Sequence, residues 1–203
     1  CRPGVVTSGA VPMARLDQAV RRVLRVKVAL GLFADPFRRI DPQREAARIG
    51  TPAHRSVARE SARRSIVMLK NDGALLPLPQ NRKIALIGPF AAGQHDLIGP
   101  WNVYGSDAEA IDLATGVRAL AGRQAQITVT QGCGIETPLD GGIAAAVAAA
   151  HAADIVVLAI GEGQDMSGEA QARTEIVVPA AQQALAEAVA ATGKPIVVLL
   201  KNG

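Results

Sequence analysis

Residues 154–160, with the sequence DIVVLAI, are the stretch that decides the fold of this chain. The run has the length of a buried strand and falls well short of the roughly 18 apolar residues that a membrane-spanning helix needs. Short apolar runs also occupy residues 83–88 and 195–200, and residues 126–131 alternate between polar and apolar side chains. The pattern predicts strands that begin at about residue 83, and no membrane partner.

Two alanine-rich stretches, residues 142–153 and 179–191, lie between these predicted strands and favour helix. Neighbouring parallel strands need crossover connections, which are usually helices. Apolar strands that alternate with helices therefore indicate a parallel sheet covered on both faces. We predict an α/β fold, a doubly wound and mostly parallel sandwich.

The first third of the chain follows a helical pattern. Residues 13–30 place apolar side chains at helical spacing with basic residues between them. The Asp-Pro pairs at 35–36 and 41–42 are expected to break any helix, because proline disfavours the α region for the residue before it. A second helix is expected over residues 51–69, with Pro52 at its first position.

The composition excludes several classes of function. The chain has 203 residues, of which 49% are hydrophobic and 20% charged, as in a globular protein rather than a disordered one. Only 2% are aromatic, which argues against a surface that stacks exposed bases. The formal net charge of +4 is a weak indication of an anionic partner, and no recognition motif accompanies it. We expect no nucleic-acid partner.

Metal and redox sites are not indicated either. Cys1 and Cys133 cannot form a disulfide framework, and no pair of CxxC motifs offers a zinc site. His54, His95 and His151 are scattered, and none has a partner at metal-ligand spacing. The sequence therefore predicts neither a metal ion nor a cofactor.

The loop after residues 154–160 carries the candidates for chemistry, because ligands of open parallel sheets bind beyond the carboxyl ends of the strands. Residues 161–176 contain several carboxylates, among them Glu162 and Glu169, together with Arg173. A carboxylate that is desolvated beside an arginine can perform acid–base chemistry. A solvated acidic loop without a catalytic role is the alternative that composition leaves open.

Several motifs occur in the order found in one enzyme family, and together they cover nearly the whole chain. They are RLD at residues 15–17, GLFADP at 31–36, VMLKN at 67–71, LLPL at 75–78, IALIGP at 84–89, and the glutamates and arginine of residues 161–174. In this order and spacing the chain resembles glycoside hydrolase family 3, and in particular the bacterial periplasmic β-glucosidase type.

The resemblance implies a fragment of a larger enzyme. Such enzymes place a (β/α) barrel before an α/β sandwich, with the active site between the two. Residues 1–50 would form the C-terminal end of the barrel domain, with its helices, and the linker. Residues 51–203 would form a sandwich domain truncated at its C-terminal side. The nucleophilic aspartate would lie upstream, so we expect no nucleophile in this chain and no activity from the fragment alone.

The resemblance also assigns residues within the loop. Glu169 matches the family's acid/base, because it precedes the small-residue stretch that leads to Arg173. Glu162 is the second candidate, and would otherwise anchor the loop. Arg173 is the candidate substrate-binding residue and would hold a carboxylate in place; a surface ion pair with Glu175 is its alternative.

The implied function is a retaining, exo-acting β-glycosidase, most simply a β-glucosidase, that is periplasmic or secreted. Its partners would be a carbohydrate substrate and the missing N-terminal barrel domain. The alternative is a noncatalytic sugar- or nucleotide-binding α/β domain. The glycine pair at residues 161–163 argues against a dinucleotide ligand, because the third glycine of that turn is missing.

Overall fold

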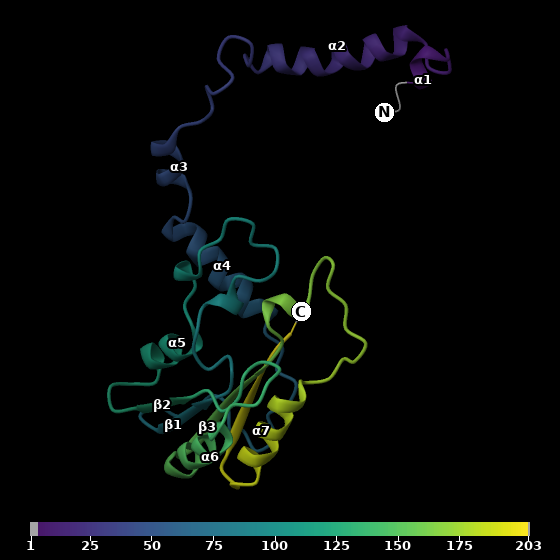
Figure 1. The fold of residues 1–203 in the computed structure, drawn as a ribbon. Helices are drawn as coiled ribbons and strands as arrows, with labels where there is room; N and C mark the ends of the chain where they lie inside the picture. Colours follow the sequence, from purple (N-terminus) through teal and green to yellow (C-terminus); the bar gives the residue numbers. More distant parts are fainter. Residues whose placement is uncertain (1–3, 203) are drawn as a thin grey trace. The chain divides into compact units, whose positions relative to one another are not determined.

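The computed structural model describes residues 4–202, and the chain divides into two compact units, Cys1–Leu69 and Lys70–Gly203. The first unit is built from helices, and the second contains a parallel sheet with flanking helices (Figure 1). The predicted domain boundary between residues 50 and 51 concerns the complete enzyme and stays a prediction.

In the first unit, the short helix α1 (Gly4–Thr7) precedes α2 (Met13–Ala29), which has the predicted extent. Gly31 follows the last turn of α2 with a φ of 70°. The Leu32 amide donates a hydrogen bond to the Lys27 carbonyl at 3.0 Å, which closes the last turn in the usual glycine-terminated manner.

As predicted, no helix runs through either Asp-Pro pair, and Asp41 has an extended backbone, with a φ of −145° and a ψ of 96°. Helix α3 (Pro42–Arg48), which was not predicted, begins at the proline. The Asp41 side chain accepts a hydrogen bond from the Arg44 amide at 3.0 Å and thereby caps the helix. Proline costs nothing at the first helical position, because the amide that it lacks would have no partner within the helix.

Helix α4 (Pro52–Ser65) begins as predicted, with the Thr51 hydroxyl accepting from the His54 amide at 3.3 Å. It ends at Ser65 rather than at about residue 69. Ile66 already has an extended backbone, and the β-branched pair Ile66 and Val67 favours that conformation over helix.

The second unit confirms the predicted α/β fold. Its strands are β1 (Lys83–Ile87), β2 (Gln126–Thr130), β3 (Ile155–Gly161) and β4 (Ile196–Lys201). They form one parallel sheet in the order β2-β1-β3-β4. The chain leaves β1 toward β2 on one side and leaves β3 toward β4 on the other side. The carboxyl ends of β1 and β3 therefore form a topological switch point, where open α/β sheets bind ligands.

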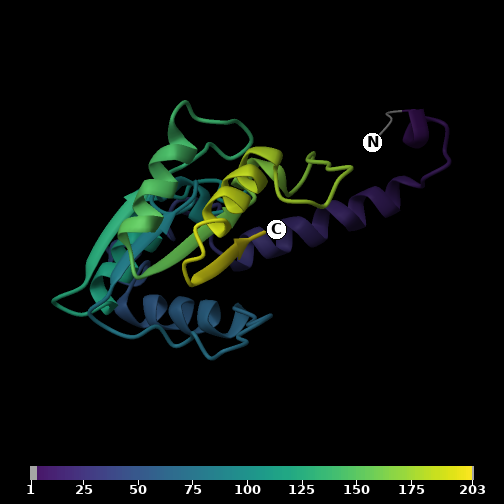
Figure 2. The same ribbon diagram turned by 90° about the horizontal axis from the view of Figure 1, so that it is seen from below.

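Helices cover both faces of this sheet. Helices α6 (Gly142–Ala152) and α7 (Ala180–Ala190) lie side by side on one face (Figure 2), as the alanine-rich stretches predicted. Helix α5 (Leu113–Leu120) packs on the opposite face and was not predicted. Three short 3₁₀ segments, η1 (His95–Leu97), η2 (Asp107–Glu109) and η3 (Gln164–Met166), lie in the loops.

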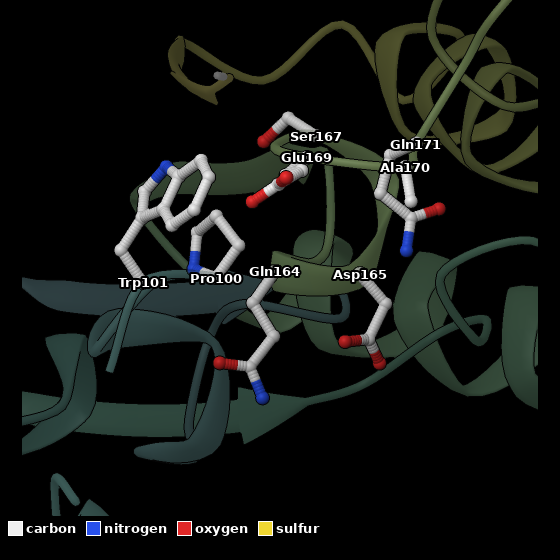
Figure 3. Close-up of a pocket in the computed structure, with 8 residues that line it drawn as sticks. All are labelled: Pro100, Trp101, Gln164, Asp165, Ser167, Glu169, Ala170 and Gln171. Carbon is white, nitrogen blue, oxygen red and sulfur yellow. The ribbon is translucent and has the colours of Figure 1, made fainter. Parts of the chain in front are cut away.

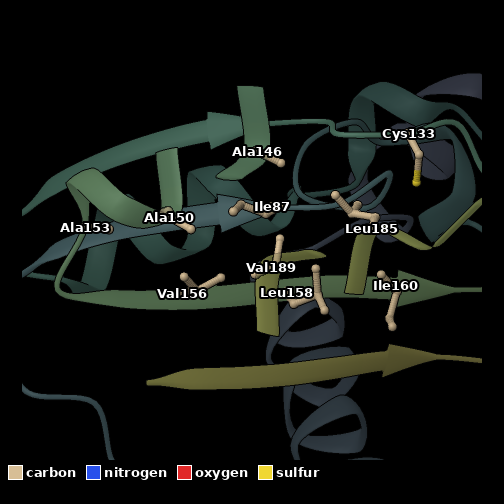
Figure 4. Packing of buried hydrophobic residues seen from close by; sticks show 11 residues of the cluster. Ile87, Cys133, Ala146, Ala150, Ala153, Val156, Leu158, Ile160, Leu185 and Val189 are labelled. Carbon is tan, nitrogen blue, oxygen red and sulfur yellow. The ribbon is translucent and has the colours of Figure 1, made fainter. Parts of the chain in front are cut away.

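The core between the sheet and helices α6 and α7 is built from aliphatic side chains (Figure 4). Ala146 and Ala150 are fully buried on α6, and their small side chains let the helix backbone approach the sheet closely. Leu185 and Val189 of α7 fill the remaining space against β3, all of whose residues are buried. Close packing of this kind leaves little room to change volume at any of these positions.

The end of β1 lies directly against β3. Gly88 has a φ of 123°, and a Cβ atom at this position would collide with the carbonyl oxygen of Ala159. Only glycine combines this backbone conformation with so close an approach of two strands. The loop that follows β1 therefore starts from a fixed point at the switch.

We predict that Gly88→Ala lowers the free energy of unfolding by about 3 kcal/mol or more, because backbone strain and the collision add. Gly193→Ala is the matched control, since Gly193 also has a positive φ, of 69°, but a Cβ atom at this position would have no heavy atom of another part of the chain within 4 Å. It should cost about 1 kcal/mol. Urea unfolding followed by circular dichroism measures both, and equal losses would contradict the role of close approach.

Candidate functional site

A pocket of about 400 Å³ lies at the switch point of the sheet (Figure 3). Its lining comes from the two loops that leave β1 and β3. The lining residues are Pro100, Trp101, Gln164, Asp165, Ser167, Glu169, Ala170 and Gln171. The rule that pointed to the loop after β3 therefore identifies one wall of the pocket, and the same rule applied to β1 would have identified the other.

Glu169 is exposed in this pocket and lies next to Pro100 and Trp101 (Figure 3). The backbone on both sides of it has positive φ, 110° at Gly168 and 62° at Ala170. A Cβ atom at Gly168 would meet the ring of Pro100 at 3.1 Å, so the loop after β3 rests closely on the loop after β1. The tight bend places Glu169 in the lining of the pocket, with its side chain exposed.

Glu162 has a different environment, at the carboxyl end of β3 and outside the pocket lining. Its carboxylate pairs with the Arg173 guanidinium, and both side chains are only about one-fifth exposed, at 21% and 22%. The other terminal nitrogen of Arg173 donates to the Val177 carbonyl at 2.8 Å. Arg173 thus holds a carboxylate in place, as one reading of the sequence expected, and its partner is Glu162 rather than Glu175.

The backbone of Glu162 is also fixed from β4. The Glu162 amide donates to the Lys201 carbonyl at 2.7 Å, and the Lys201 ammonium donates to the Glu162 carbonyl at 2.9 Å. The ammonium lies 4.9 Å from the centre of the Phe90 ring, within the range of a cation–π contact. Burial lowers the pKa of Lys201 from its ordinary value, while the nearby carboxylates of Asp96 and Glu162 oppose that shift.

A polar network that includes the lining residue Gln164 joins the two pocket loops. The Gln164 amide donates to the Asp96 carboxylate at 2.8 Å, and the Gln164 side chain contacts the Nε2 atom of His95. On its other side, the Nδ1 atom of His95 lies 3.0 Å from the Asp107 carboxylate. The hydrogen bond that the His95 ring donates to the Asp107 carboxylate raises the pKa of His95, and the charges of Asp107, Asp96 and Asp165 act in the same direction.

Sequence reasoning missed this network, because it considered His95 only as a metal ligand. Gln164 lies far along the chain from His95, Asp96 and Asp107, and the four residues form no recognisable motif. The carboxyl-end rule could have pointed to His95 and Asp96, because both lie in the loop that follows β1. Trp101 also forms part of the pocket wall.

Among residues 4–202, no group of three or more histidine, cysteine, aspartate and glutamate side chains is placed to hold a metal ion. No helix of the described chain is long and apolar enough to cross a membrane. Cys133 is buried and forms an isolated bridge with Pro138, and burial raises the pKa of its thiol.

Residues 66–203 match the family model described as Glycosyl hydrolase family 3 C-terminal domain. The chain belongs to glycoside hydrolase family 3. This membership confirms the resemblance drawn from the sequence motifs.

Relatives within family 3 carry two kinds of name. The Periplasmic beta-glucosidase of Salmonella typhimurium is 39% identical, over 99% of this chain and 29% of that protein. The Beta-xylosidase of Formosa agariphila is 36% identical, over 94% of this chain and 27% of that protein. A crystal structure of a beta-glucosidase from Listeria innocua matches with a TM-score of 0.85 at 37% identity, over 99% of this chain and 27% of that chain. The chain thus spans less than a third of the length of these relatives.

We predict that Asp107→Asn lowers the pKa of His95 toward its ordinary value, because the principal group that stabilises the imidazolium is then neutral. A raised pKa means that the interaction stabilises the fold below about pH 6.5, the ordinary pKa of histidine, and that this contribution is lost as the pH rises through the pKa in the folded protein. An NMR titration of the His95 ring protons measures the change. Glu109→Gln, on the same 3₁₀ segment, should leave the titration unmoved; an unmoved titration in Asp107→Asn would refute the assignment.

Proposed function

We propose that this chain supplies the acid/base loop of a retaining, exo-acting β-glycosidase, which releases terminal β-glucosyl residues. Its relatives of similar sequence are named beta-glucosidase and beta-xylosidase, so a β-linked glycoside is the substrate class. The observation that carries the proposal is the contrast between the two loop glutamates. Glu169 is exposed in a pocket at the switch point, whereas Glu162 is paired with Arg173 outside it.

The proposed reaction divides its steps between two carboxyl groups, roughly 5–5.5 Å apart across the anomeric carbon. A carboxylate from a barrel domain of the complete polypeptide attacks that carbon, and the bond to the departing oxygen breaks. Glu169 begins protonated and gives its proton to that oxygen. In the second step Glu169 takes a proton from water, whose oxygen displaces the enzyme carboxylate and leaves the sugar with its original configuration.

Glu169 must be protonated at the start, so its surroundings in the working enzyme must disfavour the charged form. In this chain the side chain is exposed to solvent. A sugar and a barrel domain that cover the pocket would remove water from Glu169 and raise its proton affinity. The indole of Trp101, beside Glu169 in the pocket wall, would supply an apolar surface for the sugar ring or its aglycone.

Arg173 has a supporting role in this proposal. Its guanidinium joins Glu162, at the start of the loop, to Val177, near its end. The ion pair therefore closes the loop on itself, and the segment between the two ends carries Glu169. The earlier expectation that Arg173 binds substrate directly stays a prediction, and would require a nitrogen of the guanidinium to reach the sugar beside its present partners.

We also propose that the enzyme is periplasmic or secreted, because the Salmonella typhimurium relative is named as periplasmic. Fractionation of the native host, with activity assayed in each fraction, tests this location.

We predict that Glu169→Gln, made in the complete polypeptide, lowers kcat on cellobiose by about 100-fold to 10,000-fold, the usual contribution of a general acid. On 2,4-dinitrophenyl β-glucoside, the rate of the first step, in which the glycosyl-enzyme forms, should fall less, because that leaving group needs no proton. Added azide should accelerate turnover of the activated substrate and yield a β-glucosyl azide, since a small anion replaces the missing base.

Glu175→Gln is the matched control, because Glu175 is an exposed glutamate of the same loop outside the pocket lining, and it should keep full activity. Glu162→Gln should lose activity without rescue by azide. Rescue of Glu162→Gln, with none in Glu169→Gln, would transfer the acid/base role to Glu162.

The 203-residue chain by itself should hydrolyse neither 4-nitrophenyl β-glucoside nor the corresponding β-xyloside, because the proposal assigns the nucleophile to another part of the enzyme. The complete polypeptide, assayed in parallel, should cleave at least one of the two. Turnover by the chain alone would defeat this division of roles. Binding of glucose by the complete polypeptide without turnover of either glycoside would favour a noncatalytic sugar-binding function.

A further inference from the structure

Gln182, in the first turn of α7, is a fully buried amide in an otherwise apolar interface. It lies on the same face of the helix as Leu185 and Val189, which are core residues with no exposed surface. Burial of an amide among such side chains is costly unless its donors and its acceptor all have partners. A glutamine at this position therefore calls for a reason other than packing.

The polar atoms of the Gln182 side chain form hydrogen bonds with the backbone at the end of β3 and in the loop after β2. Its Oε1 atom accepts a hydrogen bond from the Gly161 amide at 2.7 Å, and its Nε2 atom donates to the Gly161 carbonyl at 2.9 Å. The second proton on Nε2 goes to the carbonyl of Ile135, in the loop that follows β2. Both N–H donors and the carbonyl oxygen are thus in use.

Gly161 needs these bonds because β3 extends beyond β1. The last paired residues of the two strands are Ile87 and Leu158, so the final part of β3 has no strand on its β1 side. The Glu162 amide is directed to β4, where it meets the Lys201 carbonyl. Peptide groups of a parallel strand alternate between its two neighbours, so the Gly161 groups face the vacant β1 side.

The Gln182 amide fills that place in the sheet. It offers one acceptor and one donor to the same residue of β3, as a neighbouring parallel strand does through the C=O and N–H groups of two different peptide units. The Gln182 side chain thereby continues the hydrogen-bond ladder of the sheet to the residue from which the loop with Glu169 begins. Gly161 is also the exit point of the strand: its φ is 138°, and a Cβ atom there would collide with the Lys201 carbonyl.

We propose that Gln182 is a positioning residue for the loop that carries Glu169, acting through the backbone of Gly161. The inference rests on the proposed acid/base role of Glu169. With the amide removed, the end of β3 keeps its β4 bonds but loses its partner on the other side. The chain then leaves the sheet with hydrogen bonds from the β4 side alone, and the Glu169 carboxyl is held less precisely relative to the departing oxygen.

The test compares Gln182→Leu with Gln183→Leu in the complete polypeptide. Gln183 is the next residue of α7, is exposed, and bonds only to Glu187 one turn away among the described contacts of its side chain. The readout is the ratio of kcat/KM for cellobiose, which needs a positioned acid, to kcat/KM for 2,4-dinitrophenyl β-glucoside, which does not. Partial unfolding lowers both values equally and leaves the ratio unchanged.

In Gln182→Leu the ratio should fall about 10-fold or more, since small displacements of a catalytic group are costly. In Gln183→Leu it should stay at the wild-type value. An unchanged ratio in Gln182→Leu, together with a reduced ratio in Glu169→Gln, would overturn the positioning role alone. An unchanged ratio in Glu169→Gln would overturn the proposed function, and the positioning role with it.

A measurement on the unaltered enzyme covers the case in which Gln182→Leu does not fold. Amide hydrogen exchange followed by NMR or by mass spectrometry reports the protection of the Gly161 amide. We expect exchange as slow as that of the interior amides of β3, although no strand lies beside Gly161 on that side. Exchange as fast as that of exposed loop amides would overturn the inference.

Discussion

The structure depends on hydrogen-bond partners for the backbone N–H and C=O groups at the end of β3, where the chain leaves the sheet. This strand is buried along its whole length and extends beyond the end of its neighbour β1. Without another hydrogen-bond partner, its last backbone groups on the β1 side would face an apolar interface unpaired. An unpaired buried amide or carbonyl is costly. The Gln182 side chain satisfies Gly161 on one side, and Lys201 satisfies Glu162 on the other. The same bonds that stabilise the strand end also give the following loop a fixed origin.

The loop that follows β3 contains two carboxylates with different surroundings. Glu162 is drawn into an ion pair with Arg173 and helps to close the loop. Glu169, at the tip of the bend beside Trp101, remains open to the pocket. Behind it, the contacts of Gln164 with Asp96 join the loops from β1 and β3, so that the two walls of the pocket are connected. The proposed role of Glu169 as a proton donor needs both a fixed origin of the loop and an accessible side chain at its tip, because reach and orientation decide whether the carboxyl contacts the reacting atom.

The sequence predicts those features that are local and misses those that are made by tertiary contact. Composition alone predicts the buried strand and the alanine-rich helices α6 and α7. Ligands of open parallel sheets bind beyond the carboxyl ends of the strands, which then points to the loop with Glu169. Helix α5 was missed because it is short and contains Gly116, which weakens the helical pattern. Gln182 could not be assigned a role, because a glutamine in the first turn of a helix is usually an exposed residue. The partner of the Gln182 side-chain amide becomes visible only in the fold, which brings Gly161 at the end of β3 within hydrogen-bond distance.

The central claim is that Glu169 reaches the departing oxygen of a β-glycoside. The most direct measurement is a crystal structure of the complete polypeptide with an uncleavable thio-linked β-glucoside in the site. The account predicts a carboxyl oxygen of Glu169 within about 3.2 Å of the linking atom, on the side of the sugar opposite the nucleophile. A linking atom in contact with Glu162 instead, or with no carboxyl group of residues 161–176, would contradict it.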